Sequence, residues 1–94
     1  MKEQALLIEK EQILGLTYPS QVSEKPADKK KELIEKCRRA MALGNLHKVK
    51  CTIFFVDVEG LKKVNTTIWG LYENYIELKG GVLINLRYIE DIFF

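Results

Sequence analysis

Apolar and polar residues alternate over the second half of the chain, residues 49–94. Short apolar runs are broken at close intervals by residues that favour turns, and the chain ends on a fifth such run. A period of two is typical of strands that bury one face, and turn residues between such strands indicate antiparallel hairpins. The pattern therefore predicts a compact antiparallel sheet of five short strands.

The second of these runs, residues 61–72, is long for a strand and contains Gly70 in its interior. A glycine inside a strand often marks a bend or a bulge, which is how a small sheet curls toward a barrel. Near the end of the chain, Ile89 and Ile92 are spaced by three. This spacing predicts a single tight turn around residues 87–88 before the last strand.

The first half of the chain predicts two helices, of which the first is a short one over residues 3–14. Its apolar residues recur seven apart and share one face: Leu6, Leu7, Ile13 and Leu14. A helix this short with a single apolar seam is marginally stable alone. We therefore expect it to pack either against its own sheet or against a second copy of the chain.

The second predicted helix begins near Pro26 and ends at Gly44 and Asn45, which favour the left-handed conformation that stops a helix. Its apolar stripe has helical spacing and consists of Leu33, Ile34, Cys37, Ala40 and Met41. The prolines between the two helices break any regular period. Residues 1–25 are therefore predicted to form an arm and connector, and residues 26–94 the body of a single domain.

The predicted fold class is α+β, with two N-terminal helices followed by a small, strongly bent five-stranded antiparallel sheet or barrel. This order, with a bent second strand and a one-turn break before the fifth, resembles the Sm-like small β-barrels, including bacterial Hfq and the Rho-inhibiting Rof proteins. The closing pattern Ile84-x-Leu86-x-x-Ile89-x-x-Ile92 is similar to the end of those domains. The resemblance covers about half the chain and implies an Sm-like barrel, although the Arg-Gly pair of the eukaryotic family members is replaced by Arg87-Tyr88.

The composition is that of an ordinary globular domain, with 94 residues, 47% hydrophobic and 30% charged. No apolar run is long enough to span a bilayer and no secretory signal is present, so we expect a cytoplasmic protein. Cys37 and Cys51 fall on apolar faces, which predicts reduced, buried thiols. With His47 they match no zinc motif, and no catalytic constellation is visible. We therefore expect neither an enzyme nor a metal or other cofactor.

Positive charge is concentrated in residues 29–50, which hold eight basic and two acidic residues in a chain of net charge +2. A basic helix followed by a basic strand is typical of a surface that neutralises phosphates. The leading hypothesis is a small, non-catalytic binding or regulatory module for RNA or DNA. The residues predicted to contact phosphates are Lys30, Arg38, Arg39 and Lys50, with Arg87 as a further contact. A solvated helix face and a surface for an acidic protein are the alternatives.

The aromatic residues allow two interpretations. Exposed on a sheet, Trp69, Tyr72, Tyr75 and Tyr88 would form a base-stacking platform. Filling of the small core, or for Trp69 a place in the core or an interface, is the interpretation that we favour, because a domain of this size needs a few large side chains.

The chain ends on two phenylalanines, which are unfavourable in water unless they complete the core or cover an interface. Together with the first predicted helix they give the second hypothesis, a protein-interaction or self-assembly module that forms a homo-oligomer. The residues predicted at that interface are Leu6, Ile13, Phe93 and Phe94. No membrane or small-molecule partner is expected.

Overall fold

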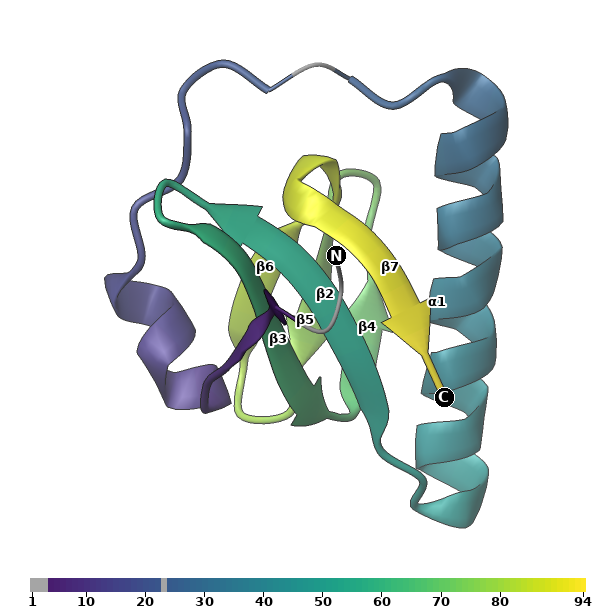
Figure 1. The fold of residues 1–94 in the computed structure, drawn as a ribbon. Coiled ribbons are helices and arrows are strands. Elements are labelled where there is room, and N and C mark those ends of the chain that lie inside the picture. The colour runs from purple at the N-terminus through teal and green to yellow at the C-terminus, as the bar shows by residue number, and fades with distance from the viewer. Residues whose placement is uncertain (1–3, 23) are drawn as a thin grey trace.

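Figure 1 shows the computed structural model, which describes residues 4–22 and 24–94. The fold is α+β, with one long helix, α1 (Ala27–His47), and two β-sheets. The first sheet contains, in spatial order, β1 (Leu6–Leu7), β3 (Gly60–Thr66), β2 (Cys51–Asp57) and β7 (Ile89–Phe93). The second contains β4 (Ile68–Leu71), β5 (Tyr75–Leu78) and β6 (Val82–Asn85). Two short 3-10 helices, η2 (Lys10–Gly15) and η3 (Leu86–Tyr88), connect these elements.

The two sheets form two layers around one core, with α1 along one side (Figure 1). β2 is antiparallel to both β3 and β7, and β1 pairs in parallel with the outer edge of β3. β4, β5 and β6 form an antiparallel meander. The α+β class is thus confirmed. The strands nevertheless pair in two separate sheets that do not close, so the single five-stranded sheet and the closed barrel are both wrong.

The bend predicted in residues 61–72 is present. This run is divided into β3 and β4 with Thr67 between them, and its two halves belong to different sheets. A bulge lies between Ile68 and Gly70, where the register with β5 shifts. The glycine therefore marks a bulge as predicted, and the tight turn before the last strand is η3.

The apolar stripe predicted for the second helix is confirmed. Leu33, Cys37 and Ala40 are buried in the core, and Ile34 and Met41 pack against it partly buried. Residues spaced three and four apart lie on one face of a helix, so this pattern could be read directly from the sequence.

The predicted end of this helix is wrong. α1 continues through Gly44 to His47, and the left-handed residue is Lys48, at φ 59°. Gly44 is buried, and a Cβ atom built on it would lie 3.2 Å from Cγ2 of Thr67. The glycine therefore allows the helix to approach the β3–β4 junction closely instead of stopping it.

The first predicted helix, residues 3–14, is also wrong; its first residue, Glu3, lies outside the described residues. The segment forms β1 and η2 instead. Leu6 and Leu7 pair with β3, and the Ile8 N–H donates to the carbonyl of Lys63 at 2.9 Å. An open sheet edge offers backbone hydrogen bonds that a single weak helical seam does not outweigh.

The arm packs on its own domain. Ile8 and Ile13 are buried in the common core, whereas Leu6, Leu7 and Leu14 are more than half exposed. The predicted seam is therefore divided: Ile13 in η2 reaches the core, whereas Leu6 and Leu7 on the edge strand β1 are both exposed.

The connector between the arm and α1 is fastened at several points. The carbonyl of Thr17 accepts from the Val58 N–H at 2.9 Å, and the Tyr18 ring stacks on Tyr88 with centroids 4.6 Å apart. The Tyr88 hydroxyl donates to the carbonyl of Pro19 at 3.3 Å. These contacts hold the connector against η3 and the β2–β3 turn.

Candidate nucleic-acid interface

Lysines from distant parts of the chain come together near the C-terminal end of α1. They line an open pocket of about 380 Å³, which we call the lysine–tryptophan pocket. Its lining residues are Glu9, Lys10, Gly44, Asn45, Lys48, Lys50, Asn65, Thr66, Thr67, Trp69 and Lys79. They come from η2, the end of α1, the segment before β2, the β3–β4 junction and the β5–β6 turn. The tertiary structure alone brings these segments together.

The pocket is electropositive, since it holds four lysines and a single carboxylate. Lys10 pairs with Glu11 at 2.8 Å. Within residues 4–22 and 24–94, Lys48, Lys50 and Lys79 form no ion pair. Three ammonium groups are thus available to an anionic ligand.

Trp69 stands at the edge of this pocket with 53% of its surface exposed. In the β4 bulge, Ile68 is opposite Leu78 and Gly70 is opposite Glu77, so Trp69 is the extra residue. Because two residues of a bulge oppose one residue of the partner strand, Trp69 is turned toward the outer face that Glu77 shares. No other ring in the described chain stacks on it.

Core filling was therefore the wrong interpretation for three of the four aromatics. Trp69, Tyr72 and Tyr75 are between 41% and 53% exposed. Tyr88 alone behaves as expected, because it is partly buried under Tyr18. The physical reason is strand alternation: Trp69 follows the buried Ile68 and Tyr75 precedes the buried Ile76, so both point outward, while Tyr72 lies in the turn between β4 and β5.

The floor of the pocket is closed by small and polar residues. Thr66 is buried, and its carbonyl accepts a hydrogen bond from the Cys51 thiol at 3.3 Å. The Asn65 side-chain carbonyl accepts from the Thr52 hydroxyl at 2.7 Å, which orients the amide. Burial raises the pKa of Cys51 to about 11 and that of Cys37 to about 12. Both thiols are free and buried, as predicted.

Of the five residues predicted to bind nucleic acid, only Lys50 lies in this pocket. Lys30 and Arg87 line a cavity of about 30 Å³ near the other end of α1, and Arg87 pairs there with Glu24 at 3.5 Å. That volume is about the share of one water molecule in the liquid. Lys30 and Lys48 are separated by about 27 Å along the helix axis, at about 1.5 Å per residue.

Arg38 and Arg39 lie on the outward side of α1. Arg38 faces Glu35 at 3.8 Å, and both side chains are more than half exposed. Arg39 borders a shallow depression that carries both signs of charge. The structure therefore does not bring the predicted basic strip together as one surface.

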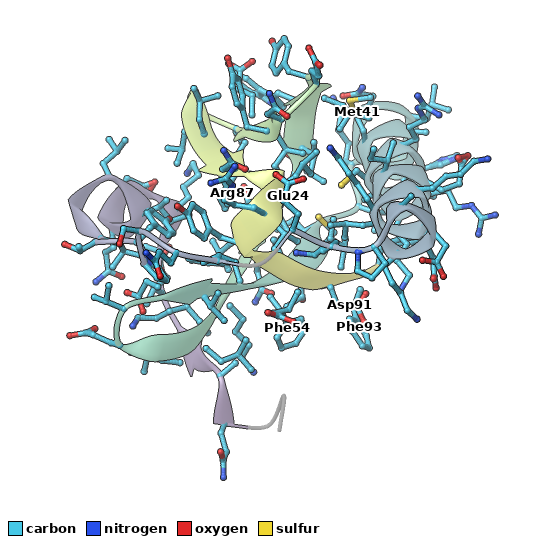
Figure 2. The ribbon with its side chains drawn as sticks, turned by 90° about the horizontal axis from the view of Figure 1, so that it is seen from above. Glu24, Met41, Phe54, Arg87, Asp91 and Phe93 are labelled. Atoms are coloured by element: carbon cyan, nitrogen blue, oxygen red, sulfur yellow. The ribbon has the colours of Figure 1, made fainter. Side chains whose placement is uncertain are left out.

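The residues predicted for self-assembly are also divided. Leu6 is 59% exposed and Phe93 and Phe94 are each 50% exposed, whereas Ile13 is 2% exposed and belongs to the core. Phe93 packs edge-on against Phe54, with ring centroids 5.3 Å apart. Figure 2 shows both rings on the side of the first sheet that is turned away from the second sheet.

One buried charge cluster is structural. Lys62 is 4% exposed, and its ammonium group donates to Asp57 at 3.1 Å and to Glu59 at 3.0 Å. The hydrogen bonds from Lys62 raise its pKa, chiefly through Glu59. Asp57 also accepts from the backbone N–H groups of Glu59 and Gly60. The cluster closes the β2–β3 turn.

Sequence reasoning missed Lys10, Asn65 and Lys79, and it misplaced Trp69. The only sequence signal for Lys79 was its place beside the Gly80-Gly81 turn, which any solvated turn shares. No protein-family model, curated protein or solved structure matches this chain. In the part of the chain that the structure describes, no group of three metal-ligating side chains gathers, and no helix is long and apolar enough to cross a membrane.

Proposed function

We propose that this protein binds single-stranded RNA or DNA at the lysine–tryptophan pocket. The observation that carries the proposal is a half-exposed indole ring, Trp69, in a pocket lined by four lysines. An indole face stacks on any nucleobase, while ammonium groups neutralise the adjacent phosphates. Asn45 and Asn65 add amide groups that can donate to and accept from base edges.

The backbone of Lys48 supports the same proposal. Glycine or asparagine is the usual residue in the left-handed position after a helix, and another residue costs roughly 1 kcal/mol there. Lys48 occupies this position at φ 59° and lines the pocket. A lysine in an unfavourable backbone conformation is explained if its ammonium group is needed at the site.

The test uses eight-nucleotide oligouridylate and oligodeoxythymidylate, with Trp69 as the probe, because it is the only tryptophan. We expect both oligonucleotides to quench its emission. The affinity should fall with salt, with a logarithmic slope of about −2 to −3 for three or four neutralised phosphates. The double variant Lys48→Glu/Lys50→Glu should bind about 100-fold more weakly, since a hydrogen bond to a charged group is worth about 1.5 kcal/mol.

The matched control is Arg38→Glu/Arg39→Glu, which changes the net charge by the same amount on the outward side of α1. Its affinity should stay within about threefold of wild type, because salt screens most of the attraction between distant charges and the ligand. Equal loss in both double variants, or no quenching of wild-type Trp69 at low salt, contradicts the proposal.

Kinship with Sm-like folds is proposed on the order of the elements. It is supported by a helix before six strand segments, of which β3 and β4 are the two halves of one bent run, and by η3 before β7. The proposal concerns ancestry only, because fold by itself does not determine function.

Self-assembly through the C-terminal aromatic end is the second candidate function. The half exposure of Phe93 and Phe94 favours it. Light scattering at high salt tests it: a salt-insensitive oligomer that Phe94→Asp dissociates supports assembly, and a monomer at all concentrations excludes it.

A further inference from the structure

A second group of aromatic residues lies next to the lysine–tryptophan pocket, on the outer face of the second sheet. Tyr72 and Tyr75 flank the turn between β4 and β5, and their rings are 5.7 Å apart. They are 50% and 41% exposed. In Figure 2, side chains project from this sheet away from the rest of the molecule. Solvated turns are usually built from small polar residues, so two large aromatic side chains beside this turn are unusual.

Gly70 places one of these rings beside Trp69. A Cβ atom on Gly70 would lie 3.0 Å from Cε2 and Oη of Tyr72, so the tyrosine ring rests directly on the glycine backbone. Trp69 and Gly70 together oppose Glu77 in the bulge, which turns both toward the same face. Any side chain at position 70 would push the Tyr72 ring away, so the glycine allows this ring to lie over the residue that follows Trp69.

The position of Tyr72 is fixed by hydrogen bonds. Its hydroxyl donates to the Glu77 carboxylate at 2.9 Å, and this bond raises the pKa of Tyr72. Its backbone N–H donates to the carbonyl of Tyr75 at 2.9 Å. A ring that is oriented before binding loses little conformational entropy when a base stacks on it.

We infer that the bound strand leaves the lysine–tryptophan pocket and continues across this face, with successive unpaired bases stacked on Trp69, Tyr72 and Tyr75. This inference rests on the proposed function and specifies its ligand as a single strand of at least three nucleotides. Duplexes are excluded, because their bases are already stacked within the helix and offer no free faces. The lysines anchor one end of the strand, and the tyrosines extend the site.

The experiment measures Trp69 quenching at low salt with oligouridylates and oligodeoxythymidylates of one to eight nucleotides. We expect the affinity to rise with each nucleotide up to at least the third. In Tyr72→Ala/Tyr75→Ala the affinity for the eight-nucleotide strands should fall by at least about tenfold per stacked base, while that for dinucleotides changes little. Tyr75→Phe should bind as wild type, because it keeps the ring, whereas Tyr72→Phe should bind only slightly more weakly, because it keeps the ring but loses the hydrogen bond to Glu77 that orients it.

Leu83→Ala is the matched control, since Leu83 is 49% exposed on β6 of the same sheet but cannot stack on a base in this way. The inference is overturned if affinity stops rising at two nucleotides, if the double alanine variant binds long strands normally, or if a duplex binds equally well. Each of these outcomes leaves binding at the pocket intact. The absence of quenching by every oligonucleotide would instead contradict the proposed function itself.

Discussion

The two ends of α1 carry basic side chains in different situations. At the N-terminal end, Lys25 donates to the carbonyls of Leu86 and Arg87, and Glu24 pairs with Arg87 (Figure 2). Farther along the helix, Lys36 pairs with Asp91 at 2.6 Å. These basic groups are used to hold elements of the fold together.

At the C-terminal end, Lys48 and Lys50 line a pocket and have no ion-pair partner among the described residues. The sequence alone shows one basic stretch across both ends. The number of charges in a stretch therefore does not identify a binding site, because a lysine that is already paired within the protein binds a ligand less strongly.

The largest effect that we expect concerns the two buried thiols, of which Cys51 donates to the carbonyl of the pocket residue Thr66. Burial raises the pKa of Cys37 from 9.0 to about 12 and that of Cys51 from 9.0 to about 11. At pH 8 the thiolate fraction should then be lower than that of an unperturbed cysteine by about 1000-fold and about 100-fold, respectively. Alkylation of native protein followed by mass spectrometry should show matching protection, which is lost in denaturant. Rapid labelling of Cys51 would show that reagents reach this thiol in the folded protein, which would contradict its burial beside the pocket.

The sign for stability follows from the same values. Unfolded thiols ionise near pH 9, whereas the folded ones stay neutral until about pH 11 to 12. The unfolded state therefore loses protons first, and stability declines as the pH rises above about 9. Urea titrations between pH 8 and pH 11 should show a falling free energy of unfolding. A flat profile would contradict the burial of both thiols.

The next largest effect concerns Lys10 and Lys79, two pocket residues that the sequence did not predict. Lys10→Glu/Lys79→Glu should weaken oligonucleotide binding about tenfold to 100-fold, chiefly through Lys79, because Lys10 also pairs with Glu11. The salt slope should become less negative by about 0.7 to 1.4. The control at the other end, Lys29→Glu/Lys31→Glu, should change affinity by less than about threefold. Similar losses at both ends would mean that overall charge, and not the pocket, attracts the ligand.

The smallest effect concerns Lys48, at which one substitution should raise stability and lower affinity. Lys48→Gly should raise the free energy of unfolding by about 0.5–1 kcal/mol, since glycine adopts φ 59° without strain. It should also weaken oligonucleotide binding about tenfold, because one ammonium contact is lost. Urea denaturation and Trp69 quenching measure the two quantities on the same protein.

Asp91→Ala is the matching test for a basic group that holds the fold together, because it removes the partner of Lys36. It should lower stability by about 1 kcal/mol through loss of the Lys36 ion pair, and it should leave affinity unchanged. If Lys48→Gly lowered stability or kept full affinity, Lys48 would be an ordinary helix-end residue with no part in the site.

Local periodicity explains the features that could be predicted. The strand pattern of residues 49–94, the turn before β7 and the apolar stripe of α1 depend on side chains close in sequence, so their spacing determined them. Gly70 marked a bulge for the same local reason. The sequence also showed that Lys48 and Lys50 belong to a basic stretch.

Only the tertiary structure decided which of these residues work together. Residues 6–15 formed β1 and η2 because the edge of β3 was available, an interaction that no local pattern shows. The fold placed Lys10 and Lys79 beside Lys48 and Lys50, and it put Trp69 in the same pocket. A pocket is built from segments far apart in the chain, and no periodicity within one segment specifies which others will lie beside it. The sequence therefore determined the elements, while long-range packing determined the candidate site.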